Sequence, residues 1–274
     1  MRTALFRRTR LAAAAVLLLG GLGLALAATQ TDIAGPPGSG QFGSQVTVLS
    51  NGNFVVTDPG YDITSPSTIL NVGAVYLYNG ATRALISTLT GSTANDQTGL
   101  NNGFEPGVTA LPNGNFVVKT FNWDDGTTQN VGALTFCNGT TGCNGVVSAA
   151  NSLVGSQMND FVGGAGVRVL ANGNYVVFSL NWDNGAAMDA GAHTWCSGTS
   201  GCTGAVSPAN SLVGSTTNDR VGSTETALLK NGDYSSLVLP GMARRWTPAR
   251  PPGATAPPDA RVRSRPRIAW LAVR

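Results

Sequence analysis

Short apolar segments alternate with Asn-Gly pairs along most of the chain. In the first such stretch, segments at residues 46–49 and 54–57 flank the letters SNGN, and segments at 72–78 and 84–89 flank NGAT. Asn and Gly tolerate the positive φ angles of tight hairpin turns, and valine-rich runs of this length are typical of strands. The pattern predicts two β-hairpins, and it contains almost no helix-period stretch.

The same pattern returns along the chain. Asn-Gly turns begin at Asn51, Asn113, Asn172 and Asn231, at intervals of 62, 59 and 59 residues. A fixed long period indicates an array of structural repeats. We therefore divide the chain into a signal peptide (1–27), a linker (28–40), repeat 1 (41–103), repeat 2 (104–163), repeat 3 (164–222), a partial repeat 4 (223–240) and a basic Pro/Arg-rich tail (241–274).

Four strands in each repeat predict an all-β fold of tandem antiparallel blades that resembles an incomplete β-propeller. A β-solenoid is the alternative, although solenoid coils are usually shorter than these repeats. Three complete blades are fewer than the roughly four to eight that close an ordinary propeller. We therefore expect the parent array to be longer.

The repeat resembles a known family. Its first copy, VGAVYLYNGATRALISTLTGSTANDQTG, and the closing letters NDQTG, NDFVG and NDRVG are similar to the FG-GAP repeats of integrin α-chain propellers and their bacterial relatives. The resemblance covers about residues 41 to 234. It implies a propeller-like fold and a role like that of large exported bacterial adhesins. The Asp-x-Asp-x-Asp-Gly calcium loop typical of such blades is absent, which leaves calcium binding in doubt.

The N-terminal segment has the layout of a secretory signal peptide. Four arginines lie within the first ten residues, an apolar run covers residues 11–26, and small residues stand at Ala25 and Ala27. This order predicts cleavage after about Ala27. A membrane anchor is the alternative, but the run is short and rich in Ala and Gly. We expect a secreted or cell-surface protein without a transmembrane segment after cleavage, exported by the Sec or the twin-arginine route.

The net charge of +3 does not describe the predicted folded part. Residues 28–240 hold five Lys/Arg and thirteen Asp/Glu, whereas the positive charge lies in the signal peptide and the tail. Nucleic-acid binders usually carry their positive charge on a folded face. The sequence therefore predicts no nucleic-acid partner.

Two loops combine an aromatic residue with several oxygen-bearing side chains. The candidate Ca²⁺ ligands are Asp124, Asp125, Asn130, Asp183, Asn184 and Asp189. Calcium needs six or more oxygen ligands, and each loop offers fewer. The alternative is an Asx turn after a strand, with Trp123 and Trp182 packed between blades. No other cofactor is expected.

Four cysteines form two Cys-x5-Cys pairs at equivalent positions of repeats 2 and 3: Cys137, Cys143, Cys196 and Cys202. Repeat 1 lacks both members of the pair, so each pair acts within its own repeat. In an exported protein this spacing predicts a small disulfide across the second hairpin. A zinc site built from all four thiolates is the alternative.

We find no sequence motif for catalysis. His193 is the only histidine, and Val75 and Leu134 occupy the same place in the other repeats, which favours a strand position. The distinctive residues recur in every repeat, whereas a catalytic constellation usually occurs once. We expect a non-catalytic module for binding or adhesion, with an unknown extracellular protein or glycan as ligand. A fragment of an extracellular propeller-scaffold enzyme and a non-functional product are the alternatives.

Repeat 4 begins as NGDY and then turns into arginine and proline. Deletion of one nucleotide after codon 234 accounts for this change. In the shifted reading, residues 263–273 permit VSAANSLVGS, a string that occurs intact at 147–156. We interpret residues 241–274 as frameshifted and disordered. A genuine Pro-rich basic tail is the alternative.

The signal-peptide hypothesis makes a direct prediction. The exported protein should begin near Ala28, because the peptidase cleaves after the small residues that follow the apolar run. N-terminal sequencing of the secreted material measures this. Met1 on that material would contradict the prediction.

Overall fold

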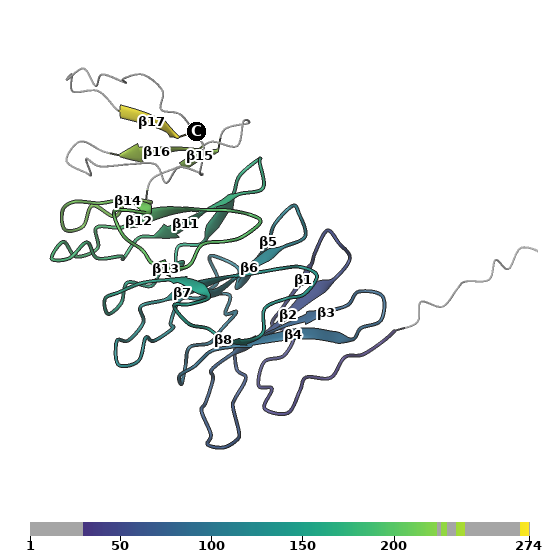
Figure 1. Ribbon diagram of the computed structural model, residues 1–274. Helices are drawn as coiled ribbons and strands as arrows, with labels where there is room; N and C mark the ends of the chain where they lie inside the picture. The colour runs from purple at the N-terminus through teal and green to yellow at the C-terminus, as the bar shows by residue number, and fades with distance from the viewer. Residues whose placement is uncertain (1–29, 224–225, 229–233, 239–268, 274) are drawn as a thin grey trace, which may run out of the picture. The chain divides into compact units, whose positions relative to one another are not determined.

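The computed structural model describes residues 30–223, 226–228, 234–238 and 269–273. The chain divides into two units, Met1–Ala34 and Gly35–Arg274. Every regular element of the described residues is a β-strand, which confirms the predicted all-β fold (Figure 1). The described part of the chain has no helix that is long and apolar enough to cross a membrane.

Repeat 1 forms four antiparallel strands in chain order, and its bounds agree with the predicted ones within two residues. The strands are β1 (Gln45–Val48), β2 (Phe54–Asp58), β3 (Ala74–Tyr78) and β4 (Leu85–Thr90). In the register, Val55 lies opposite Leu77 and Thr90 lies opposite Ala74. The two predicted hairpins are therefore present.

Repeats 2 and 3 use the same order. Their main strands are β5 (Val108–Ala110), β6 (Phe116–Thr120), β7 (Ala133–Cys137) and β9 (Ser152–Val154), then β10 (Val167–Val169), β11 (Tyr175–Ser179), β12 (Ala192–Cys196) and β14 (Ser211–Val213). Tandem four-stranded antiparallel repeats, not closed into a barrel, are thus confirmed for the described residues.

Two short strands were not predicted. β8 (Gly145–Val146) belongs to repeat 2 but pairs in parallel with β4 of repeat 1 (Figure 1). β13 (Gly204–Ala205) of repeat 3 pairs in the same way with β9 of repeat 2. Each of the first two sheets therefore has five strands, of which the fifth comes from the following repeat.

The predicted fourth repeat and the tail are only partly described. β15 (Thr226–Leu228), β16 (Tyr234–Val238) and β17 (Ala269–Val273) form a three-stranded antiparallel sheet. The signal peptide (1–27) and residues 239–268 lie outside the described residues. The interpretation of the tail as frameshifted and disordered remains a prediction there, whereas Ala269–Val273 forms a strand.

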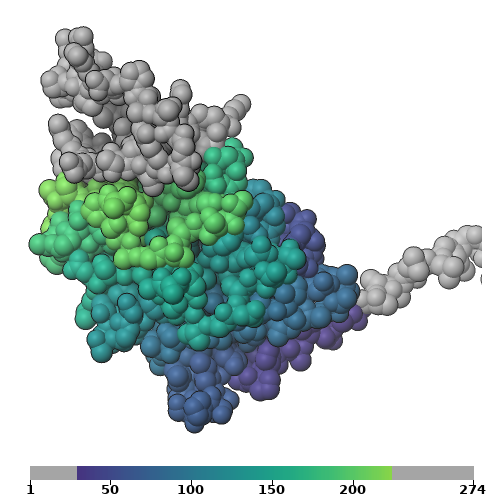
Figure 2. Space-filling model, viewed as in Figure 1, coloured from purple at the N-terminus to yellow at the C-terminus, as the bar shows by residue number. Residues whose placement is uncertain are grey.

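Hydrophobic clusters lie between successive sheets. Val55 and Leu77 of repeat 1 pack with Phe116 and Val118 of repeat 2. A second cluster joins the outward side chains of repeat 2 to those of repeat 3: Val117, Leu134, Leu153, Tyr175 and Val177. Because a middle sheet is covered on both faces, its strands are continuous apolar runs rather than alternating ones. On the face seen in Figure 2, the colours accordingly follow the chain from repeat to repeat.

The Asn-Gly turns have the predicted backbone. Gly52, Gly114 and Gly173 have φ angles of 87°, 87° and 83°. Only glycine adopts this conformation without steric cost, and Asn is the next best residue. The glycine of each turn therefore fixes the reversal between the first two strands of its repeat.

His193 is a core residue of β12, as the sequence predicted. It lies opposite Phe178 in the strand register, and the two rings meet edge to face with centroids 4.4 Å apart. The side chain is 1% exposed. Burial lowers the pKa of His193 from 6.5 to about 4, so the folded protein holds the neutral imidazole at neutral pH.

Replacing Gly173 by Val should destabilise the protein by about 1 kcal/mol or more, because a β-branched residue resists the positive φ. Gly173→Asn should cost clearly less, since Asn tolerates this backbone. Chemical denaturation of both variants measures the difference. Equal losses would show that the turn does not depend on the φ angle.

The burial of His193 makes stability depend on pH. As the pH falls from about 6.5 to about 4, this histidine becomes protonated in the unfolded chain but stays neutral in the folded chain. The free energy of unfolding should therefore fall by up to about 3 kcal/mol over this range. His193→Leu, which copies Leu134 of repeat 2, should lack this loss. Denaturation curves of both proteins at several pH values provide the measurement. Parallel pH profiles would contradict the prediction.

Candidate functional site

A buried aspartate near the end of repeats 1 and 2 reaches into the following repeat. The Asp160 carboxylate accepts hydrogen bonds from the backbone N–H groups of Ser156 and Gln157, at 2.7 and 2.8 Å. Its other oxygen accepts one from the backbone N–H of Asp183 in repeat 3, at 2.9 Å. Burial raises the pKa of Asp160, and the three N–H donors oppose this shift. Asp96 makes the same contact to the backbone of Asp124, at 3.3 Å.

The aspartates proposed as central calcium ligands close their own loops. Asp124 Oδ1 accepts from the backbone N–H of Asn130, and Asp183 Oδ1 accepts from that of Asp189, both at 2.7 Å. Asp62 of repeat 1 makes the same contact, although its loop lacks the other candidate ligands. These bonds span six or nine residues, so they close a whole loop rather than the short Asx turn of the alternative. Trp123 and Trp182 pack in the clusters between repeats, as that alternative predicted.

Three of the four remaining candidate ligands have other partners. Asn130 Nδ2 donates to Asn159, Asn184 Nδ2 donates to the Gly214 carbonyl, and Asp189 forms an ion pair with Arg220 at 3.1 Å. No bond is described for the Asp125 carboxylate. The described residues contain no group of three or more His, Cys, Asp or Glu side chains placed to hold a metal. The structure thus uses most of these side chains for loop closure and contacts between neighbouring loops.

The disulfide prediction is confirmed in both repeats. Cys137 bonds to Cys143 and Cys196 bonds to Cys202, with Cα atoms 5.1 and 5.3 Å apart. All four sulfurs are consumed, so the alternative of a four-thiolate zinc site is wrong. Cys143 and Cys202 also pack against the clusters between repeats. Each disulfide therefore holds a hairpin and joins a core.

Each disulfide hairpin is hydrogen-bonded to the Asn-Gly turn of the preceding repeat. The Gly139 carbonyl accepts hydrogen bonds from the side-chain amides of Asn51 and Asn53, at 2.8 and 2.9 Å. The Gly198 carbonyl accepts them from Asn113 and Asn115, at 2.6 and 3.1 Å. Sequence reasoning recognised both hairpins but missed this contact, because nothing in one repeat shows which group of the next it meets.

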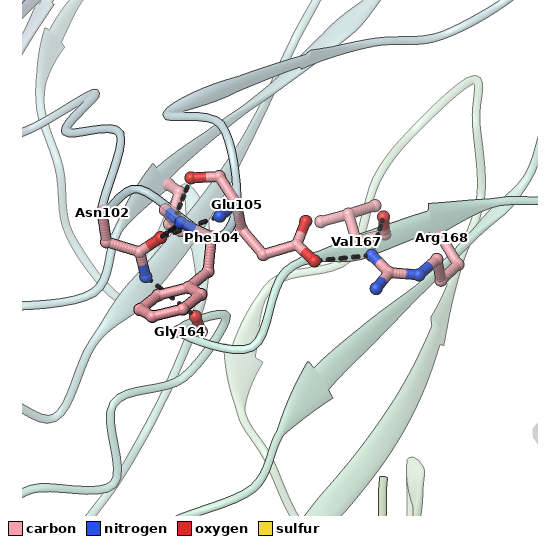
Figure 3. A network of polar contacts seen from close by, with 7 residues as sticks. Asn102, Phe104, Glu105, Gly164, Val167 and Arg168 are labelled. Atoms are coloured by element: carbon pink, nitrogen blue, oxygen red, sulfur yellow. Dashed lines mark hydrogen bonds and ion pairs between the residues drawn. The ribbon is translucent and has the colours of Figure 1, made fainter. Parts of the chain in front are cut away.

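One loop has no counterpart in the other repeats. Residues 100–106, which we call the junction loop, join repeat 1 to repeat 2, and the corresponding link between repeats 2 and 3 is shorter. Asn102 Oδ1 accepts from the backbone N–H groups of Phe104 and Glu105, and its amide donates to the Gly164 carbonyl (Figure 3). These contacts fix the junction loop against the start of repeat 3.

Two cationic side chains also bind the junction loop. Lys119 Nζ donates to the Glu105 carbonyl at 2.9 Å, and Arg168 forms an ion pair with the Glu105 carboxylate at 3.0 Å (Figure 3). Burial lowers the pKa of Lys119 to about 8, and Glu105 opposes this shift. A Cβ atom at Gly166 would overlap the Glu105 side chain, so glycine makes room for the ion pair.

The fixed junction loop presents a bare aromatic ring. The Phe104 side chain is 93% exposed, the most of any large hydrophobic residue described. Sequence reasoning did not identify Phe104, Glu105, Lys119 or Arg168 as a group. The available signal was the first repeat interval, 62 residues against 59, since an insertion in one repeat marks a place where the array departs from its common design.

Comparison with known proteins identifies the repeat itself. A family model described as "Repeat of unknown function (DUF5650)" matches the chain three times, over residues 48–100, 110–164 and 169–223. No curated protein matches the chain. The three matches coincide closely with repeats 1, 2 and 3 and together cover more than half of the chain. The chain therefore belongs to the family of repeats of unknown function named DUF5650.

Proposed function

We propose that the protein is an exported, non-catalytic module for binding or adhesion at the cell surface or outside the cell, and that Phe104 is its main contact with the ligand. The observation that carries this proposal is the exposure of Phe104 on the junction loop. A bare aromatic residue on a fixed support is a common binding hot spot, because little side-chain entropy is lost on contact. Repeats build the scaffold, and the inserted loop supplies the contact.

Export is supported by two independent features. The N-terminal 27 residues have the charge and hydropathy order of a signal peptide. The two disulfides are of a kind that persists in oxidising compartments. The resemblance of the repeats to FG-GAP blades also supports the proposal, because that resemblance implies an adhesin-like role for the array.

The proposal of a non-catalytic role rests on the chemistry of the junction loop. Lys119, Glu105 and Arg168 form a polar cluster that occurs once in the described repeats, as a catalytic site would. The Lys119 side chain is 3% exposed, however, and its amine is committed to the Glu105 carbonyl. The Arg168 guanidinium offers only hydrogen-bond donors and is paired with the Glu105 carboxylate. The cluster therefore supports the position of Phe104 rather than a reaction.

The ligand class follows from what the loop presents. An exposed aromatic ring on a loop where Asn101 is also exposed suits a partner with apolar patches and hydrogen-bonding groups, which describes proteins and glycans. The acidic body of the chain gives no reason to expect a polyanion. We propose a protein or glycan ligand outside the cell.

The test compares two variants of the full exported chain on a glycan array and a panel of extracellular proteins. Phe104→Ala should weaken binding at least about tenfold, because it removes the exposed aromatic contact. Met158→Ala is the matched control, since its side chain is 56% exposed on another loop. It should bind like the parent protein. Equal binding by all three proteins, or no binding by the parent chain, would contradict the proposal.

A further inference from the structure

The contact between neighbouring repeats occurs twice with the same geometry. In the first, Gly145 and Val146 lie beside Leu89 and Thr90, and the Val147 N–H donates to the Thr90 carbonyl at 2.9 Å. In the second, Gly204 and Ala205 of repeat 3 lie beside Leu153 and Val154 of repeat 2. There the Val206 N–H donates to the Val154 carbonyl, also at 2.9 Å. Each donated strand directly follows a disulfide hairpin.

The hairpin glycine before each donated strand packs against side chains of the preceding sheet. An added Cβ at Gly142 would overlap Ser87 and would lie 3.3 Å from Leu77 Cδ2, and one at Gly201 would overlap Phe136. In the strand registers, Leu77 pairs with Val55 and Phe136 pairs with Val117. Leu77 and Phe136 are therefore equivalent positions that receive the following repeat.

Trp195 is the same position in repeat 3, since it pairs with Val176. Leu77 is 1% exposed and Phe136 is half-buried, whereas Trp195 is 42% exposed. The Trp195 side chain is therefore exposed at a position where the hairpin glycine of the following repeat covers Leu77 and Phe136. This indicates that the receiving position of repeat 3 is not filled in the same way.

The strand edge near Trp195 also has no partner among the described strands. β14 corresponds to β4 and β9, because Val213 pairs with Ala192 as Val154 pairs with Ala133. In the described part of the chain, β14 is the last strand of a four-stranded sheet. The Val213 carbonyl is thus the counterpart of the two carbonyls that accept donated strands. An open edge of this kind is ready to pair with another segment.

We propose that Trp195 and the edge of β14 form an acceptor site for a disulfide-closed hairpin and a Gly-Val-type strand of a further DUF5650 repeat. The 274 residues contain four cysteines, all in the two hairpins already described, so they hold no third hairpin of this type. A second copy of this chain does not fit, because both of its donor strands are occupied by its own sheets. The occupant therefore comes from a repeat outside these residues.

The test uses a peptide with the sequence of residues 196–210, CSGTSGCTGAVSPAN, closed by its own disulfide. The intact chain should bind this peptide with a Kd of about 1 mM or tighter, measured by calorimetry. Two altered peptides should bind at least about tenfold more weakly, which corresponds to about 1.4 kcal/mol. One carries an N-methyl group at the position of Val206, which removes the donated N–H. The other carries Gly201→Ala, which places a Cβ against the tryptophan.

A protein variant completes the design. Trp195→Ala should weaken peptide binding by a similar factor, whereas Met188→Ala, exposed by 62% elsewhere in repeat 3, should leave it unchanged. Absence of binding by the unmodified peptide at a concentration of about 1 mM would overturn the proposal. Equal binding by the unmodified and N-methylated peptides would do so too, because it would show apolar association without strand pairing. Neither outcome depends on Phe104, so the proposed function is tested separately.

Discussion

The array depends on a two-residue strand that repeats 2 and 3 each add to the sheet of the preceding repeat. The last strand of a sheet has a row of N–H and C=O groups with no partner in its own repeat, and leaving them bare invites aggregation. β8 and β13 supply that partner for repeats 1 and 2. The Asn-Gly turns and the closing aspartates add hydrogen bonds to the same junctions. A repeat is therefore completed by its successor, which is why a single unit is not a natural fragment of this fold.

Repeat 1 differs from the later repeats in the residues on its outer face. Phe42 covers its outer face and packs against Tyr76 and Tyr78, with ring centroids 5.6 and 6.5 Å apart. The corresponding residues of repeat 2 are Thr135 and Cys137, and Cys137 packs in the cluster shared with repeat 1. Phe42 thus covers this face of repeat 1, whereas repeat 3 keeps an edge that is open among the described strands.

The sequence predicted the parts of this architecture that lie within one repeat. The Asn-Gly turns, the four main strands, the disulfide pairs and the strand position of His193 all follow from local pattern. The donated strands could not be predicted, because two residues carry no periodicity and pair in parallel with a distant segment. The junction loop was missed for a related reason. Its position, and with it the exposure of Phe104, depends on the contacts of Glu105 with Lys119 and Arg168.

The calcium candidates show the opposite limit of sequence reasoning. Aspartates and amides on one loop satisfy a ligand pattern and an Asx-turn pattern equally well. Only the positions of the backbone N–H groups separate the two, and here Asp124 and Asp183 accept from their own loops. The partial fourth repeat and the basic tail reach beyond the described residues, so their interpretation still rests on the sequence.

Native-state hydrogen exchange tests the central claim most directly. The Val147 and Val206 amides donate across repeat boundaries, at sites with two-residue strands that could not stay protected alone. If the donated strands hold the array together, these amides should open with free energies within about 0.5 kcal/mol of core amides such as Val118 and Val177. Exchange by local opening that is cheaper by about 2 kcal/mol or more would show that the repeats are held by side-chain packing alone.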